Sequence, residues 1–191
     1  AVRLEPASAV RPARVAVNGG GKDRLRAAMT PASVADQLIA AAERAAEAGI
    51  SVLLPSGADP SGHLPMGTVF RRRGEELTDA VQTRLDRLAG ADVVLCDNFG
   101  DVELRDPGYW SDDGLHLNSR GHHRVAGNVL QSLGVAAPPE FAQIASAELP
   151  DTNYRSSAYW RAHVLPWIGR RLTGRSSGDG RAPKRPHLEP L

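Results

Sequence analysis

The sequence lacks the features that mark disulfide cross-links, zinc fingers and membrane spans. Its single cysteine, Cys96, excludes an intrachain disulfide and leaves a zinc finger without its ligands. No run approaches the roughly 18 consecutive apolar residues that mark a transmembrane helix. The formal net charge of +1 gives no broad attraction for nucleic acid. A disulfide framework, a membrane span and a nucleic-acid partner are therefore not expected.

A single α/β domain of ordinary size fits what the chain does contain. Its 191 residues, 41% of them hydrophobic, can bury one core but do not suffice for two such domains with linkers. The first residues hold neither an initiator methionine nor an apolar signal segment, so targeting is not readable from them. A cytoplasmic location is the default expectation, and the sequence leaves the oligomeric state open.

Three short apolar runs predict buried parallel strands over residues 13–18, 51–55 and 92–97. Each run is followed by glycine, asparagine, serine or aspartate, the residues that end strands in turns. Cys96 falls within the third run and is expected to be a buried core thiol. In open α/β sheets the reactive groups lie on loops at the carboxyl ends of the strands, so we expect the functional residues on the loops after these three runs.

Apolar residues at helical spacing separate and follow these strands. They predict helices over 33–48 with Ser33 as the cap, from near Val69 or Gly74 to Leu88, over 119–133, and over 157–172. The alternation of strand and helix indicates a parallel sheet with right-handed crossovers and helices on both faces. Residues 175–191 are basic and contain several glycines and prolines, so we expect them to be disordered.

The most specific stretch is Tyr109-Trp-Ser-Asp-Asp-Gly-Leu-His-Leu-Asn-Ser-Arg-Gly-His-His123, which places Asp113 three residues before His116 and just ahead of a predicted helix. It resembles the last signature block of the SGNH/GDSL-type serine ester hydrolases. The flanking residues that also fit that pattern are Trp110, Leu115, Asn118 and Gly121. The resemblance implies that Asp113 orients the imidazole and that His116 accepts the proton of a catalytic serine. The alternative is an ordinary polar loop before a helix. Asp112 lacks the family spacing and is expected to be solvated.

A glycine-rich turn follows the first predicted strand and contains the run Gly20-Gly21-Lys22-Asp23. It resembles the block written Gly-x-Asn-Asp in the same family, whose asparagine side chain donates a hydrogen bond to the oxyanion. Lys22 stands at the asparagine position, and its long charged side chain does not reproduce a short planar amide. The resemblance thus implies an oxyanion position at Gly20 and Lys22. Taken alone, the glycines indicate a strand-to-loop turn that needs positive φ.

The nucleophile block of the family, a Gly-Asp-Ser followed by an apolar residue, occurs nowhere in the sequence, and neither does a Gly-x-Ser-x-Gly elbow. We expect the first strand, the nucleophile loop and the second strand to lie upstream of these residues. Ser56 and Ser61 follow the second predicted strand on the correct edge of the sheet, but the proline, glycine and aspartate around them are ordinary turn formers. Neither serine is therefore expected to be the nucleophile.

A metal site is the rival interpretation of the histidine-rich stretch, which offers four potential ligands: Asp113, His116, His122 and His123. Adjacent histidines at a helix start point in different directions, and the usual i, i+4 pair is missing. We expect no metal and no organic cofactor, and interpret His122 and His123 as polar residues of the helix N-terminus. His63 lies in a Ser-Gly-His-Leu-Pro loop and is expected to be solvated.

The expected fold is a flavodoxin-like three-layer α/β/α SGNH hydrolase fold with a parallel sheet whose N-terminal strands are missing. We expect residues 1–135 to form the hydrolase-like domain, 136–174 a C-terminal extension with a helix packed on it, and 175–191 the basic tail. The distal part, with its tryptophan-containing helix and Gly-Arg-Ser-Ser-Gly-Asp-Gly run, resembles actinobacterial members of the group. The resemblance implies hydrolysis of a small-molecule carboxylic ester by a Ser-His-Asp triad whose serine lies outside this chain. The alternative is a degenerate relative that keeps the scaffold for binding.

The 191-residue chain by itself is expected to be marginally stable and inactive. In a flavodoxin-like sheet of order 2-1-3-4-5 the missing first strand lies beside residues 13–18, so their backbone groups lose partners along one edge. Each backbone group kept from water without a partner costs on the order of 1 to 3 kcal/mol, against about 5 to 15 kcal/mol of stability for a normal domain. The purified chain should not turn over a chromogenic short-chain ester. A cooperatively unfolding monomer whose hydrolysis disappears in His116→Ala would contradict this expectation.

Overall fold

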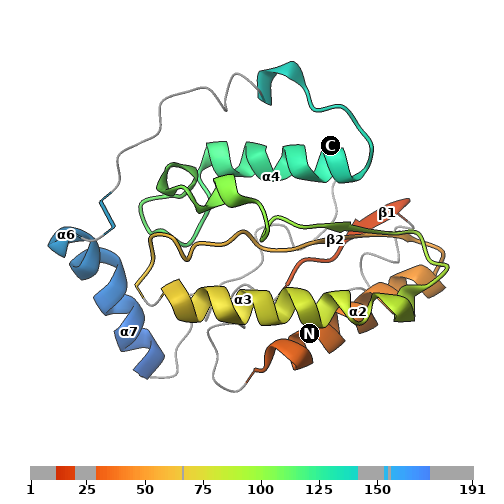
Figure 1. Cartoon of the computed structure of the whole chain (residues 1–191), viewed down its shortest axis with the longest axis horizontal. Coiled ribbons are helices and arrows are strands. Elements are labelled where there is room, and N and C mark those ends of the chain that lie inside the picture. The colour runs from red at the N-terminus through yellow and green to blue at the C-terminus, as the bar shows by residue number, and fades with distance from the viewer. Residues whose placement is uncertain (1–11, 20–28, 66, 142–152, 155, 173–191) are drawn as a thin grey trace. The chain divides into compact units, whose positions relative to one another are not determined.

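The computed structural model describes residues 12–19, 29–65, 67–141, 153–154 and 156–172. These residues fall into two compact units, one within Ala1–Thr152 and the other within Asn153–Leu191. The first unit holds the sheet, and the second is helical (Figure 1). The domain boundaries expected at residues 135 and 174 stay predictions.

Three parallel strands form the central layer of the first unit. They are β1 (Arg14–Ala16), β2 (Ser51–Pro55) and β3 (Val93–Cys96), hydrogen-bonded in the order β1-β2-β3. In this register Val15 is paired with Val52, and Leu53 is paired with Val94. The three predicted strands are thus confirmed as parallel neighbours. The observed first and third strands end one or two residues inside their predicted limits.

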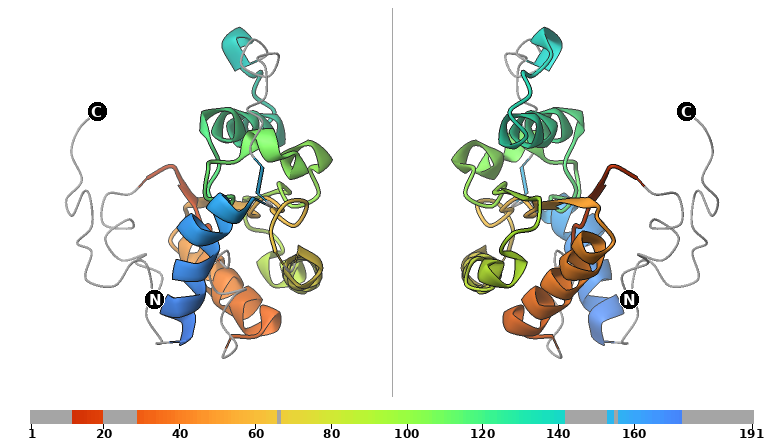
Figure 2. Two further views of the ribbon diagram at one scale, coloured as in Figure 1. Left: turned by 90° about the vertical axis from the view of Figure 1, so that its left-hand side faces the viewer. Right: turned by 90° about the vertical axis from the view of Figure 1, so that its right-hand side faces the viewer.

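Helices cover both faces of this sheet (Figure 2). α2 (Pro31–Glu47) and α3 (Gly67–Gln82) lie on one side and α4 (Ser119–Ser132) lies on the other, which is the predicted three-layer α/β/α arrangement. The core includes buried side chains of the sheet and of α2; its central members are Val17, Ile39, Ala42, Ile50, Val52 and Leu54. Complete burial of Ile39 or Val52 contributes about 1.5 to 3 kcal/mol each. This packing holds the sheet in place, and the loops that carry the candidate site emerge from the carboxyl ends of its strands.

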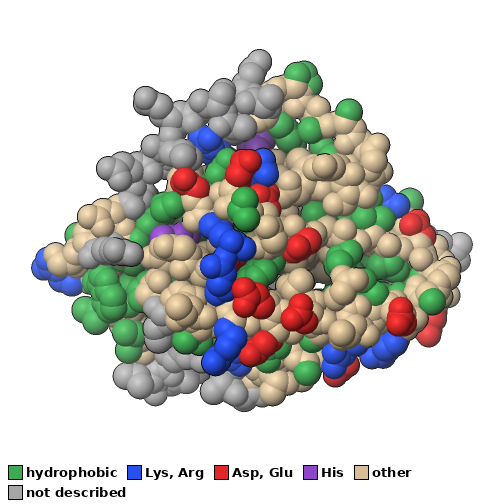
Figure 3. Space-filling view, in the orientation of Figure 1, with side chains coloured by type: hydrophobic (Ala, Val, Ile, Leu, Met, Phe, Trp, Pro, Cys, Tyr) green, Lys and Arg blue, Asp and Glu red, His purple; other side chains and the backbone are tan. Residues whose placement is uncertain are grey.

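Charges of opposite sign are interspersed over the face shown in Figure 3. On α3, Arg71 and Arg72 form ion pairs with Glu75 and Glu76, one helical turn further on, at N···O distances of 3.5 and 3.6 Å. Exposed i, i+4 pairs of this kind contribute only about 0.3 to 0.5 kcal/mol each. The face therefore carries no broad field of one sign, in keeping with the net charge of +1.

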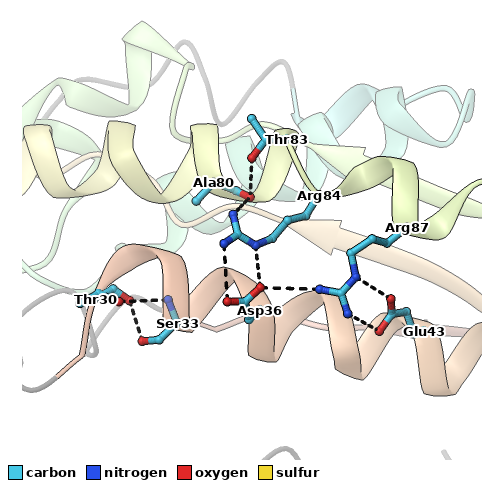
Figure 4. A network of polar contacts seen from close by, with 8 residues as sticks. All are labelled: Thr30, Ser33, Asp36, Glu43, Ala80, Thr83, Arg84 and Arg87. Atoms are coloured by element: carbon cyan, nitrogen blue, oxygen red, sulfur yellow. Dashed lines mark hydrogen bonds and ion pairs between the residues drawn. The ribbon is translucent and has the colours of Figure 1, made fainter.

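α2 begins earlier than predicted because a different residue caps it. The sequence suggests Ser33 as the cap, but the Thr30 hydroxyl oxygen accepts the hydrogen bond from the Ser33 amide. Pro31 then occupies the first helical position, where its missing N–H costs nothing. The Ser33 hydroxyl instead donates to the Thr30 carbonyl oxygen (Figure 4). The helix ends before Gly49, whose φ of 73° favours glycine over residues with a Cβ.

α3 (Gly67–Gln82) begins and ends earlier than predicted. The apolar pattern continues to Leu88, but α3 stops at Gln82 and a separate 3₁₀ turn, η2 (Leu85–Leu88), follows it. Two ion pairs join this region to α2 (Figure 4): Arg84 Nε to Asp36 at 2.7 Å, and Arg87 to Glu43 in a two-pronged pair at 2.9 Å. The periodicity does not reveal the break, because Leu85 and Leu88 still pack against the core after the change of helix type.

The second unit contains one helical run over the predicted range 157–172. It comprises α6 (Ser157–Tyr159), the π-helical turn η5 (Trp160–Val164) and α7 (Leu165–Leu172). Pro166 follows the π-helical turn and has no N–H for an i→i−4 hydrogen bond, which accounts for the change of pitch there. Among the helices that the structure describes, none is long and apolar enough to cross a bilayer.

α4 comes very close to the preceding loop at Gly121. A Cβ atom at Gly121 would lie 2.3 Å from the Tyr109 carbonyl oxygen and 2.8 Å from Leu117 Cδ2, closer than real Cβ atoms come. Gly127, further along the same helix, has room, since its Cβ would meet Phe141 Cδ2 only at 3.9 Å. Packing therefore requires glycine at position 121 and not at position 127.

Alanine substitutions at these two glycines are expected to have opposite effects on stability. Alanine is preferred to glycine in a helix by about 1 kcal/mol, so Gly127→Ala should raise the free energy of unfolding slightly. Gly121→Ala should lower it by about 1 to 3 kcal/mol, because the backbone oxygen of Tyr109 moves only if the whole loop shifts. Urea unfolding followed by circular dichroism measures both changes. Equal effects of the two substitutions would contradict the close approach at Gly121.

Candidate active site

The connection from β3 to α4 presents the Asp-His motif on a short loop. Two 3₁₀ turns, η3 (Val102–Arg105) and η4 (Pro107–Tyr109), lead to it. Trp110 and Leu117 then form an isolated antiparallel bridge, within which the Ser111 amide donates to the His116 carbonyl oxygen at 2.8 Å. The bridge closes the loop, which lies at the end of the sheet where β2 and β3 terminate (Figure 1).

Asn118 connects this loop to the start of α4 through side-chain hydrogen bonds. Its side-chain oxygen accepts the Gly121 amide at 3.0 Å and so caps the helix. Its side-chain amide donates to the carbonyl oxygens of Gly108 and Trp110, at 2.7 and 3.1 Å. One side chain thus satisfies three backbone groups, two in the loop and one in the helix, and holds the two elements in a single arrangement.

Asp113 and His116 are in direct contact, as the motif predicts. Asp113 Oδ2 lies 2.6 Å from His116 Nδ1, and Asp113 Oδ1 accepts from the backbone amides of Leu115 and His116 at 2.9 and 3.0 Å. Gly114, with a φ of 66°, makes the tight turn between them. The Asp113 side chain is 31% exposed and the His116 side chain 69%. The carboxylate therefore bonds to its own loop, whereas most of the imidazole is open to a reactant.

These contacts determine the charge of the Asp113 carboxyl group. Partial burial raises the pKa of Asp113, but hydrogen bonds from the His116 amide, the His116 ring and the Leu115 amide together outweigh it, so the pKa is lowered. The carboxyl group is ionised at neutral pH and can only accept hydrogen bonds. The proton in the 2.6 Å contact then belongs to Nδ1, which leaves His116 Nε2 as the nitrogen that can accept a proton from a reactant.

The prediction of a solvated His63 is wrong. The ring is half-buried: its Nε2 lies 2.9 Å from the Gly114 carbonyl oxygen, and its centroid lies 5.2 Å from that of the Trp110 ring. Burial is the largest influence on the pKa of His63 and lowers it, so the ring is neutral at pH 7. The contact with Gly114 joins positions 51 residues apart, which no local sequence pattern reveals. The loop after β2 thus takes part in the candidate site.

A carboxylate–guanidinium pair that local patterns do not reveal joins the β3–α4 connection to α4. Arg124 Nε and Nη2 lie 2.7 and 3.1 Å from the two carboxylate oxygens of Asp101, whose side chain is only 9% exposed. Asn128, one turn further along the helix, donates to the same carboxylate at 2.8 Å. Burial raises the pKa of Asp101, but the hydrogen bonds from Arg124 and Asn128 lower it overall. A two-pronged pair fixes direction as well as distance, so α4 is held against the connection.

Ser56 makes the contacts of a turn residue. Its hydroxyl donates to Asp97 Oδ1 at 3.1 Å and accepts from the Phe99 amide at 2.9 Å, which ties the loop after β2 to the loop after β3. The Ser61 amide donates to Asp59 Oδ1 at 3.0 Å within its own loop. The Ser56 hydroxyl therefore has a role in holding two site loops together.

The remaining predictions concern the glycine-rich turn, two histidines of α4, Cys96 and a metal site. Gly20 and Lys22, the predicted oxyanion position, lie outside the described residues, so that assignment stays a prediction. His122 is exposed on α4, and His123 Nδ1 lies 2.6 Å from a carbonyl oxygen of its own helix. Cys96 is buried, as predicted. Within the described ranges, no group of three His, Cys, Asp or Glu side chains is arranged to hold a metal ion.

Comparison with known sequences places these residues in a family. The sequence model of the GDSL-like Lipase/Acylhydrolase family matches residues 1–124, a range that covers well over half of the chain and includes the Asp-His loop. The chain therefore belongs to this family, as the resemblance of its motifs to SGNH/GDSL hydrolases implies. No curated protein and no solved structure matches the chain. Family membership supports a hydrolase of ester bonds in general.

The lowered pKa of Asp113 predicts how its contribution to stability depends on pH. A carboxyl group with a lower pKa in the folded state binds fewer protons there, so its stabilising contribution is present above the unfolded pKa of about 3.9. That contribution is lost as the pH falls through the folded pKa. Asp113→Asn should therefore be less stable than the wild type at about pH 6, and the difference should narrow below about pH 4.

Urea unfolding at a series of pH values measures this difference between the two proteins. Asp112→Asn is the matched control, because Asp112 is the adjacent aspartate and its side chain is exposed. A difference between wild type and Asp113→Asn that does not change with pH would contradict the lowered pKa.

Proposed function

We propose that Asp113 and His116 are the acid and base of a Ser-His-Asp ester hydrolase. The observation that most supports this assignment is the 2.6 Å contact between Asp113 Oδ2 and His116 Nδ1 beside a largely exposed imidazole. Ionised Asp113 accepts the Nδ1–H bond, fixes the tautomer, and stabilises the imidazolium that forms when Nε2 takes a proton. Ester hydrolysis, the general activity of the family, supplies the reaction in which such a pair acts.

The proposed reaction has two acyl-transfer steps. In the first, the serine Oγ bonds to the ester carbonyl carbon while its proton passes to His116 Nε2; the alcohol oxygen then leaves and takes that proton. In the second, a water oxygen bonds to the acyl carbon while one water proton passes to Nε2. The serine oxygen leaves with the proton, and the acid is released. Each cycle consumes one water molecule and returns His116 to its starting state.

We further propose that the serine belongs to a Gly-Asp-Ser block outside these residues and that Gly20 and Lys22 contribute to the oxyanion site. No Gly-Asp-Ser occurs in the sequence, and the Ser56 hydroxyl is engaged by Asp97 and Phe99. Lys22 stands where the resembling block has asparagine, and lysine has a charged ammonium group on a long side chain in place of a planar amide. Loss of one oxyanion donor costs about 10²- to 10³-fold in turnover, so a badly placed Lys22 slows the reaction without abolishing it.

A second candidate function is a non-catalytic relative that keeps the scaffold for binding. The missing Gly-Asp-Ser block and Lys22 at the asparagine position favour it. The coding sequence upstream of these residues separates the two functions. A Gly-Asp-Ser block there supports the hydrolase, and its absence supports the binding scaffold.

Paired substitutions in the full-length protein test the catalytic assignment. Asp113→Asn should lower kcat for a p-nitrophenyl ester by about 10²- to 10⁴-fold, and His116→Ala by at least as much, with little change in KM because both groups act in the transition state. The controls are Asp112→Asn and His122→Ala, which change exposed neighbours of the same type and should stay within about threefold of wild type.

Two kinds of result would change the proposed assignment in different ways. Equal losses in Asp112→Asn and Asp113→Asn, or full activity in His116→Ala, would remove Asp113 and His116 from the mechanism. Covalent labelling of a serine inside the 191 residues by a fluorophosphonate would place the nucleophile within this chain and leave the Asp113–His116 assignment intact.

A further inference from the structure

We propose that His63 is a positioning residue for the Asp113–His116 pair. The inference rests on the function proposed for that pair, and it gives a residue of the loop after β2 the task of holding the turn that presents it. Its starting point is the 2.9 Å contact between His63 Nε2 and the Gly114 carbonyl oxygen. Gly114 lies in the turn between Asp113 and His116. A contact that fixes its peptide group therefore also affects the positions of these two residues.

The geometry of one peptide unit links His63 to the Asp113 carboxylate. The Gly114 carbonyl and the Leu115 amide belong to the same planar unit, so they point in opposite directions and rotate together. The carbonyl oxygen contacts His63, and the amide donates to Asp113 Oδ1 at 2.9 Å. At Gly114, where no Cβ limits rotation, the tilt of this plane depends on such contacts. The hydrogen bond from His63 thereby aims the Leu115 amide at the carboxylate.

His63 is suited to this task because its own surroundings are fixed. Its ring lies 5.2 Å from that of Trp110, which is buried and donates from Nε1 to the Leu104 carbonyl oxygen at 2.7 Å. The loop that carries His63 is held at Asp59, whose fully buried carboxylate lies 3.2 Å from Arg105 Nε. The hydrogen bond to Gly114 therefore connects the turn to buried parts of the first unit.

The protonation state of His63 decides what it supplies. Burial lowers the pKa of the ring, and the opposing influences of Gly114, Arg105, Asp59 and Asp106 do not cancel that effect. We assign the one N–H group of the neutral ring to Nε2, the nitrogen that lies 2.9 Å from the Gly114 oxygen, because that oxygen can only accept. Position 63 thus requires a neutral donor at the reach of Nε2, and it does not require a positive charge.

Three substitutions at position 63 separate donation from mere space filling. His63→Gln keeps an amide N–H at the reach of Nε2, His63→Asn carries the same amide one bond shorter, and His63→Leu has no donor. In the full-length protein we expect kcat on a p-nitrophenyl ester to fall about 10- to 100-fold in the Asn and Leu variants, with KM unchanged, because a small misplacement of the pair suffices for that loss. The Gln variant should stay within about threefold of wild type. His122→Gln, at an exposed histidine, is the control.

A second readout does not depend on turnover. The Nδ1–H proton of His116, observed by nitrogen-edited NMR, reports directly on the contact with Asp113. We expect its resonance in wild type, His63→Gln and His122→Gln, and its loss through exchange with water in His63→Asn and His63→Leu.

Each possible result either supports or overturns the role proposed for His63. Wild-type kcat and an intact resonance in His63→Leu would overturn it. Equal losses in all three His63 variants, in proportion to unfolding seen by circular dichroism, would also overturn it, since they show a role in stability alone. If His116→Ala leaves hydrolysis unchanged, the proposed function fails, and the NMR series alone then decides whether His63 positions the Asp113–His116 contact.

Discussion

The Asp113 carboxylate is the group on which the arrangement of the candidate site depends. It accepts hydrogen bonds from two backbone amides, those of Leu115 and His116, and from the His116 ring. Because two of these donors belong to the backbone, the carboxylate holds the turn closed independently of the imidazole. The same donors keep it ionised, and an ionised carboxylate is what directs the Nδ1 proton of the ring inward. Loop geometry and acid–base chemistry therefore have one physical origin.

The surrounding structure holds this turn through buried contacts more than through exposed ones. The ion pairs between α2 and the region around η2 lie in solvent, where such pairs contribute at most about 1 kcal/mol each. The Asp101 carboxylate, by contrast, is nearly buried and accepts from Arg124 and Asn128, and hydrogen bonds to charged groups of this kind contribute about 1.5 to 3 kcal/mol. Loss of the Asp101 contacts therefore costs more than loss of either ion pair, and the connection that leads to the site is held by the stronger of these polar contacts.

The sequence predicts most of the fold because the signals are local. Apolar runs of strand length and apolar stripes at helical spacing mark β1, β2, β3, α2 and α4 within a few residues of their observed limits. It predicts the Asp113–His116 contact for the same reason, since the two residues are three positions apart on a tight turn. The errors in the predicted helix limits also have physical causes. Thr30 and Ser33 both have hydroxyl groups suited to capping α2, and the apolar residues of η2 continue the stripe of α3 across a break.

Contacts between residues far apart in the sequence are what the sequence does not predict. His63 reaches Gly114 across 51 positions and Arg124 reaches Asp101 across 23, and neither spacing belongs to any helix or strand period. Their meeting depends on the parallel sheet, which brings the ends of successive strands to one edge. A histidine in a turn therefore looks solvated until the sheet places another loop beside it.

A double-mutant cycle on Asp113 and His116 tests the central claim, that the two residues act as one acid–base unit in ester hydrolysis. The measurement is kcat/KM of the full-length protein for a p-nitrophenyl ester in wild type, Asp113→Asn, His116→Ala and the double variant. If Asp113 acts through His116, Asp113→Asn should cost at least about 10²-fold in the wild-type background and less than about threefold in the His116→Ala background. Equal costs of Asp113→Asn in both backgrounds would show that the two residues act independently and would contradict the account.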